Sequence, residues 1–202
     1  PSDEPLLPDL DIDVGKLQID RFIAEKPVSG ERRVATLSGK AHIEDGRAQV
    51  TLNGRTLPGQ GNSDRIKLVL DAVPEANKLA LDLDLNAPAD GMIAAMAGLD
   101  QALSARVKGS GDWARWDGRL DADLGGKQFT RFALTGRDGT FAVKGPAQLS
   151  RLFGPDSDGL FGPTANVDLA AAFEERRADL SGGVSSDTFR LDADGLVDLS
   201  DN

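Results

Sequence analysis

Apolar residues at every second position dominate this sequence and constrain its fold more than any other feature. The clearest case is residues 79–85 (LALDLDL), in which leucines alternate with Ala80, Asp82 and Asp84. Successive side chains of a β-strand point to opposite faces, so this pattern places leucine on one face and mainly aspartate on the other. Alternation of this kind argues against a parallel sheet that is buried on both faces. The sequence therefore predicts antiparallel strands with one apolar face.

The same alternation recurs along the chain and predicts an all-β antiparallel meander of roughly 12 to 15 strands. The apolar positions that are expected to share one face are Leu10, Ile12, Val14, Leu17, Ile19, Ile66, Leu68, Leu70, Leu79, Leu81, Leu83, Leu85, Leu103, Val107, Leu120, Leu124, Val167, Leu169, Phe173, Leu180, Val184, Phe189 and Leu191.

Short turn signals separate these segments, as a meander requires. Asp-Gly and Gly-Gly pairs tolerate positive φ and fit tight hairpins. The predicted turns lie at residues 14–16, 44–47, 125–126, 137–139 and 193–195. Two Gly- and Pro-rich segments, 58–63 and 154–163, are expected to be exposed loops.

Residues 90–99 (DGMIAAMAGL) break the alternation and predict a short helix. Met92, Ile93, Met96 and Leu99 fall at helical spacing, with Asp90 as the N-cap and Gly98 as the stop signal.

Residues 146–153 (PAQLSRLF) predict a second helix, with Pro146 at its first position and Leu149, Leu152 and Phe153 on one face. The apolar side chains of these two helices could plug a groove, or the helices could simply pack over the end of a sheet. Each helix follows a proline, Pro88 or Pro146, which suggests two strand-set-plus-helix repeats that meet near residues 125–140 of a single segment, 1–202.

A sheet with one apolar face must place that face against something. It can close into a β-sandwich or barrel, or it can stay open as a half-pipe whose apolar concave face receives acyl chains. The chain has only 8 Phe, 2 Trp and no Tyr, so its apolar face is mainly aliphatic rather than anchored on aromatic residues. This composition and the short sequential connections favour the open half-pipe.

Charge and composition exclude several function classes. The 23 Lys and Arg against 33 Asp and Glu give a net charge of −10, which argues against nucleic acid and against an anionic membrane surface as partners. The absence of Cys removes thiolate chemistry and disulfides. The single histidine, His42, is expected to be an exposed strand residue.

Closely spaced aspartates invite two further interpretations, a calcium site and a pair of glycosidase carboxylates. The pairs and triplets concerned are Asp9, Asp11 and Asp13, Asp82 and Asp84, Asp121 and Asp123, and Asp192 and Asp194. Solvated aspartates on an outward strand face explain all of them, and the chain is poor in the aromatic platforms that carbohydrate sites use. We expect no enzyme activity, no metal and no cofactor.

The stretch from Leu79 to Leu124 resembles the TamB and AsmA-like family of Gram-negative envelope proteins. The residues that carry the likeness are LDLDLNAPADGMIAAMAGLDQALSARVKGSGDWARWDGRLDADL, including a G-D-W-x-x-W-x-G hairpin formed by Gly111, Asp112, Trp113, Trp116 and Gly118. The segments LDIDVGKLQIDRF and FRLDADGLVDLSDN are similar to the family as well. Trp113 and Trp116 could contact lipid at a groove rim or cover a sheet edge.

This resemblance implies a long β half-pipe that carries phospholipid across the periplasm and supports outer-membrane biogenesis. It implies an inner-membrane anchor and a TamA-like outer-membrane barrel partner, both through regions outside this chain, which starts at Pro1 and is expected to be a fragment. The alternative function is a translocation and assembly scaffold for outer-membrane proteins or autotransporters.

Overall fold

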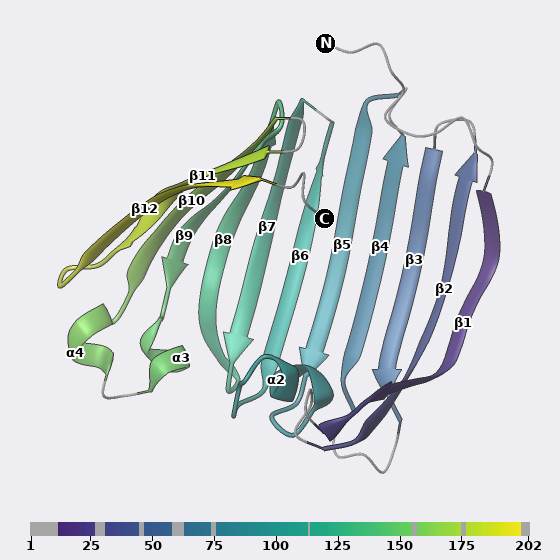
Figure 1. Ribbon diagram of the computed structural model, residues 1–202, viewed down its shortest axis with the longest axis horizontal. Coiled ribbons are helices and arrows are strands. Elements are labelled where there is room, and N and C mark those ends of the chain that lie inside the picture. The colour runs from purple at the N-terminus through teal and green to yellow at the C-terminus, as the bar shows by residue number, and fades with distance from the viewer. Residues whose placement is uncertain are drawn as a thin grey trace.

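One open antiparallel sheet makes up most of the described protein (Figure 1). The computed structural model describes residues 12–26, 31–44, 47–57, 63–73, 76–112, 114–154, 157–174 and 177–198. Within them, 12 strands pair in chain order, each with the next, and the sheet does not close on itself. The predicted fold class, an antiparallel meander left open, is therefore confirmed, and the closed sandwich or barrel is not formed.

The strands are long, from 8 residues in β9 to 13 in β1. Their bounds are β1 (Ile12–Ala24), β2 (Arg33–Glu44), β3 (Arg47–Thr56), β4 (Arg65–Val73), β5 (Lys78–Ala87), β6 (Leu103–Gly111), β7 (Arg115–Leu124), β8 (Lys127–Arg137), β9 (Thr140–Ala147), β10 (Ala165–Glu174), β11 (Arg177–Ser185) and β12 (Arg190–Asp198).

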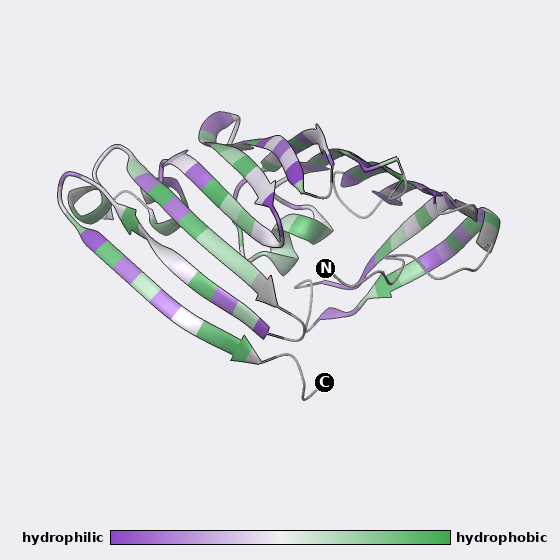
Figure 2. Cartoon of the chain, turned by 90° about the horizontal axis from the view of Figure 1, so that it is seen from above, coloured by the Kyte–Doolittle hydropathy of each residue, from purple (hydrophilic) through white to green (hydrophobic). Residues whose placement is uncertain are grey.

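The sheet is arched rather than flat. Seen from above, β1 and β12 form the two ends of the arch, and α2 (Met92–Met96) lies inside it (Figure 2). We call the side that carries α2 the concave face and the other side the convex face. Among the described residues, only Leu124 and Thr56 are large side chains with almost no exposure, so this part of the chain forms a single-layered sheet without a packed second layer on the concave face.

The helices among the described residues lie at one end of the strands, which we call the helix end. The connections there are long between β1 and β2, β3 and β4, β5 and β6, and β9 and β10, whereas the connections at the opposite end span two to four residues. α2 lies between β5 and β6, and α3 (Ser150–Phe153) and α4 (Asp158–Phe161) lie between β9 and β10. One end of the concave face is thus partly covered, whereas the connections between strands at the opposite end are short.

Both predicted helices exist, but their starts differ from the prediction. α2 begins after Gly91, which makes no side-chain cap, so Asp90 is not its N-cap. Gly98, with φ of 67°, ends that helical segment as predicted. Pro146 belongs to β9, because its carbonyl accepts a hydrogen bond from the Thr130 hydroxyl at 2.7 Å and Ala147 still pairs with β10. α4 occupies part of the segment predicted to be an exposed loop, and its Phe161 is half-buried.

Three of the predicted turns are hairpin connections and two are wrong. The connections at 44–47, 125–126 and 137–139 join β2 to β3, β7 to β8 and β8 to β9. At 14–16 the register of β1 shifts against β2, so the extra residue is absorbed by a bulge and the strand continues. Residues 193–195 remain within β12 because Ala193 and Gly195 pair with β11.

The convex face carries a lattice of opposite charges. Cross-strand pairing aligns Lys67, Asp84, Arg106, Asp121 and Arg131 on successive strands β4 to β8. Arg106 lies 2.8 Å from Asp84, and Arg131 lies 2.8 Å from Asp121. These pairs are exposed, so each contributes little stability, but opposite charges facing each other favour this register.

Asp71 is the least exposed carboxylate of the convex ion pairs described here, and its pair predicts a pH dependence. A hydrogen bond from Lys78 Nζ at 2.7 Å, with the nearby charge of Arg47, lowers the pKa of Asp71 below its usual 3.8. A carboxylate whose pKa is lowered by folding stabilises the fold at pH values above its unfolded-state pKa. This stability is lost as the pH falls through its folded-state pKa. Asp71→Asn should therefore cost up to about 1 kcal/mol in urea unfolding at neutral pH. The difference from the unmodified chain should shrink below about pH 4, and a pH-independent difference would contradict this assignment.

Candidate functional site

The concave face carries continuous rows of apolar residues that run across the strands. Cross-strand partners share a face, so the register identifies each row. The middle row consists of Leu17, Gly39, Leu52, Leu68, Leu83, Val107, Leu120 and Phe132. The next row towards the helix end begins with Ile19, Leu37, Gly54, Ile66, Leu85, Ala105 and Ala122. We call this concave apolar surface the trough.

The trough is open to solvent towards both edges of the sheet, at β1 and at β9 to β12. Its most exposed apolar side chains lie on β1 and on β9 to β12, with 38–59% of their surface accessible, and are Leu17, Ile19, Phe22, Phe141, Leu169, Leu180, Leu191 and Val197. The leucines of β4 and β5 between them are half-buried, mainly by their neighbours in the sheet. Exposed apolar side chains gathered on one face of a sheet are typical of a binding surface.

The structure brings most of the predicted lining residues together on this one face. The register places Val14, Leu17, Ile19, Ile66, Leu68, Leu70, Leu79, Leu81, Leu83, Leu85, Leu103, Val107, Leu120, Leu124, Val167, Leu169, Leu180, Val184 and Leu191 there. Ile12 and Phe173 lie in β1 and β10, but their side chains are outside the described part, and Leu10 is outside the described residues altogether. Phe189 precedes β12 and packs on Phe161 of α4, with ring centres 5.3 Å apart.

Sequence reasoning missed the contribution of four strands to the trough. These residues are Leu37, Val50 and Leu52 of β2 and β3, and Phe132, Leu134, Phe141 and Val143 of β8 and β9. These apolar residues also occur at every second position. Glycine or threonine occupies some of the other inward positions of the same strands, which weakens the apolar pattern. Phe22 was missed because a second register shift in β1, between Ile19 and Phe22, reverses the alternation there.

Trp116 lies on the concave face near the β6–β7 hairpin, and two glycines provide the space for its indole. A Cβ atom on Gly109 would lie 1.9 Å from the Trp116 ring, and one on Gly118 would lie 2.5 Å from it. The ring therefore lies across β6 and β7 as part of the trough floor. Asp112 closes the hairpin by accepting a hydrogen bond from the Arg115 amide at 2.5 Å. Trp113 is outside the described residues.

Gly109→Ala should destabilise the protein because its Cβ would overlap the Trp116 ring. We expect a loss of about 1–3 kcal/mol in urea unfolding, measured by circular dichroism, and a changed tryptophan emission spectrum. Gly195→Ala is the matched control, since it lies in β12 on the same face and an added Cβ would meet no atom within 4 Å. Equal stability of the two variants would show that the indole does not need the glycine.

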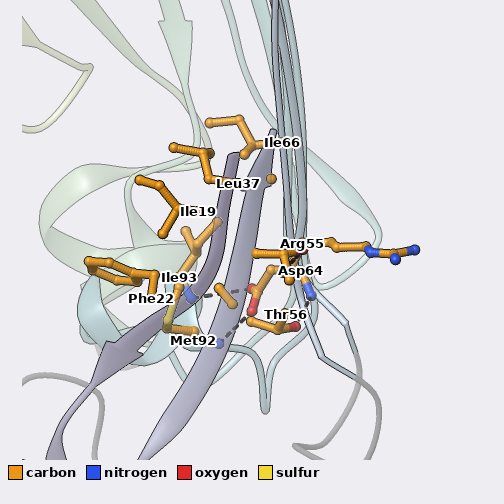
Figure 3. A pocket seen from close by; sticks show the side chains of 12 residues that line it. Ile19, Phe22, Leu37, Arg55, Thr56, Asp64, Ile66, Met92 and Ile93 are labelled. Carbon is orange, nitrogen blue, oxygen red and sulfur yellow. Dashed lines mark hydrogen bonds between the residues drawn. The ribbon is translucent and has the colours of Figure 1, made fainter. Parts of the chain in front are cut away.

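A pocket of about 230 Å³ lies between α2 and the sheet at the helix end of β1 to β4 (Figure 3). Its apolar wall is formed by Ile19, Phe22, Ala35, Leu37, Ile66, Met92 and Ile93. Met92 is buried and packs in a cluster with Ala24 and Ala35, whereas Met96 is 51% exposed. Of the three α2 residues predicted as a possible plug, two thus face the sheet and one faces solvent.

Asp64 fixes the position of α2. Its carboxylate accepts hydrogen bonds from the backbone amides of Met92 at 2.7 Å and Ile93 at 3.2 Å, and the residue is only 2% exposed. Its own amide donates to the Thr56 hydroxyl at 2.8 Å. The cap of α2 is therefore supplied by the β3–β4 connection, far away in the sequence.

α3 and α4 occupy the same end of the sheet near β9 and β10. Phe153 stacks on Phe161 with ring centres 5.1 Å apart, and the Gln101 side-chain amide donates to the Arg151 carbonyl at 2.6 Å. Phe153 and Leu152 are nevertheless 64% and 41% exposed, and Leu149 is half-buried. These three residues, predicted as a second plug, leave large apolar area accessible beside the trough.

The predicted polar side chains that the structure describes lie on the convex face, away from the trough, whereas Asp9, Asp11 and the side chain of Asp13 lie outside the described part. Asp82 pairs with Lys108 at 2.9 Å, and Asp192 pairs with Arg190, whose hydrogen bond lowers the pKa of that carboxylate. His42 is half-buried rather than exposed and lies on the same side. The described residues contain no group of three or more His, Asp or Glu arranged to hold a metal ion. None of their helices is long and apolar enough to cross a membrane.

No protein-family model, curated protein or solved structure matches this chain. The resemblance of residues 79–124 to the TamB and AsmA-like family stays a prediction, and the trough itself is the basis for a functional proposal.

Proposed function

We propose that this protein binds the acyl chains of phospholipids in the trough and provides a passive path for them, as a segment of a periplasmic lipid-transport protein. The observation that carries the proposal is the continuous apolar surface shared by the described strands and left uncovered by a second layer. The resemblance to the TamB and AsmA-like family supports the periplasmic setting, the inner-membrane anchor and the outer-membrane barrel partner.

The energetic argument concerns the cost of moving hydrocarbon through water. Each exposed CH₂ costs about 0.8 kcal/mol, so a sixteen-carbon chain faces a barrier on the order of 12 kcal/mol. Neighbouring strands lie about 4.8 Å apart, so the rows across this sheet extend over roughly 50 Å. Contact with these rows offsets much of the barrier along that length.

The two faces suit a conduit for amphipathic molecules. Leu, Val and Ile offer no directional contacts, so a chain can slide along them without breaking hydrogen bonds. The headgroup stays in water above the trough, and the charged convex face keeps the sheet soluble and resists lateral association. The chain needs no catalytic residues, metal or cofactor for this role.

Recovery of lipid tests the proposal. The purified protein is incubated with phosphatidylethanolamine–phosphatidylglycerol vesicles, separated from them by size exclusion, and extracted for mass spectrometry. We expect on the order of one phospholipid per chain or more. The water-soluble headgroup, glycerophosphoethanolamine, should not bind. Absence of lipid, together with binding of unfolded outer-membrane barrel proteins, would instead favour the assembly scaffold.

A further inference from the structure

The pocket beneath α2 differs from the rest of the trough because it has walls on more than one side. The sheet supplies Leu37 and Ile66 as its floor, β1 supplies Ile19 and Phe22, and α2 closes over it with Met92 and Ile93 (Figure 3). Ile19 and Phe22 are 38% and 49% exposed, so this side of the pocket is continuous with the open trough. An elongated apolar ligand can therefore enter it from the trough.

The polar groups around the pocket already form hydrogen bonds within the protein or point away from the pocket. Both Asp64 carboxylate oxygens accept α2 amides, and the Thr56 hydroxyl accepts the Asp64 amide. The Arg55 side chain extends away from the pocket (Figure 3). The described lining residues therefore do not offer a cationic group to a headgroup, and the negative charge of Asp64 disfavours a phosphate or carboxylate.

We propose that this pocket is a binding site for the methyl end of one acyl chain, distinct from the sliding surface of the trough. An engineered cavity of about 150 Å³ holds benzene, so a pocket of about 230 Å³ takes an alkyl segment of roughly eight or nine carbons by proportion. The inference rests on the proposed function, since the rest of the chain and its headgroup would lie in the trough.

The position of the pocket gives it a consequence for transport. Asp64 holds α2 against β1 to β4 at the helix end, so the enclosed methyl end stops there while the remainder of the chain lies across the rows. The site would thus orient a bound lipid with its tail end towards β1 and its headgroup away from α2.

Photoreactive palmitic acid provides the test, because a diazirine can be placed near its methyl end or near its carboxylate. With the unmodified protein, we expect cross-links from the methyl-end probe to peptides containing Phe22, Met92 or Ile93 at about tenfold the yield of the carboxylate-end probe. Peptides of β5 and β6, in the trough, should be labelled by both probes.

Ala35→Leu should block the pocket, since Ala35 is buried against Met92. This variant should reduce the methyl-end preference to about onefold while β5 and β6 remain labelled. The matched control is Ala133→Leu, which adds the same side chain at an exposed convex position between Arg119 and Lys144 and should keep the preference. If Ala35→Leu does not fold by circular dichroism, Ile93→Trp fills the same pocket from α2.

The outcomes separate the two proposals. Equal labelling of the α2 peptides by both probes, with the trough labelled, would overturn the pocket and leave the conduit intact. Absence of labelling from β5 and β6 would overturn the conduit itself. Retention of the methyl-end preference in a folded pocket-filling variant, Ala35→Leu or Ile93→Trp, would also overturn the assignment of the site.

Discussion

Leu83→Asp should lower the amount of phospholipid recovered with the protein by about tenfold or more. Leu83 lies in the middle row of the trough, between Leu68 of β4 and Val107 of β6. A carboxylate there would lie between apolar neighbours in the row and would have to be desolvated under a bound acyl chain. The measurement is lipid per chain by mass spectrometry after incubation with vesicles, with folding checked by circular dichroism.

The control for this substitution is Val69→Asp, which introduces the same charge on the opposite face. Val69 lies in the convex row between Thr51 and Asp82, and 36% of its surface is exposed. The Val69→Asp variant should bind as much lipid as the unmodified chain. Equal loss in both variants would indicate that added charge, rather than the trough, controls binding, and equal retention would remove Leu83 from the binding surface.

Asp64→Ala should release α2 from the sheet. Two backbone amides, those of Met92 and Ile93, lose their acceptor, and the buried carboxylate leaves a small void. We expect a loss of about 2 kcal/mol in the free energy of unfolding and faster hydrogen exchange of the α2 amides. The rest of the sheet should retain its exchange protection, because its hydrogen bonds do not depend on α2.

Asp90→Ala is the comparison for this prediction. Asp90 lies two residues before α2 and does not cap it, so its replacement should leave the exchange of the Met92 and Ile93 amides unchanged. Gly91→Ala disturbs the same contact between Asp64 and α2, because a Cβ atom on residue 91 would lie 2.4 Å from an Asp64 carboxylate oxygen. Unchanged exchange at α2 in Asp64→Ala would mean that packing of Met92 alone holds the helix.

The alternation of apolar residues was sufficient to predict the fold class and most of the trough. Strands such as β5, with leucine at alternate positions from Leu79 to Leu85, have one apolar face whatever their neighbours are. Short turns at the end opposite the helices then favour pairing of the strands that they join, whereas the longer connections at the helix end do not by themselves fix the neighbour. The trough follows because antiparallel register places these apolar faces side by side.

The remaining details depend on long-range contacts that no local pattern encodes. The register shifts in β1, which bring Leu17 and Phe22 to the concave face, are set by pairing with β2. The capping of α2 by Asp64 joins residues that only tertiary structure brings together, so a local rule selected Asp90 instead. The pocket beneath α2 was unpredictable for the same reason.

Site-specific photo-cross-linking tests the central idea most directly, namely that acyl chains occupy one face of this sheet. A photoreactive amino acid is placed at Leu83 in the trough or at its neighbour Asp84 on the convex face, and the protein is irradiated in the presence of phospholipid vesicles. Lipid adducts should form from position 83 and be nearly absent from position 84. Equal adduct yields from the two positions would contradict the proposed trough.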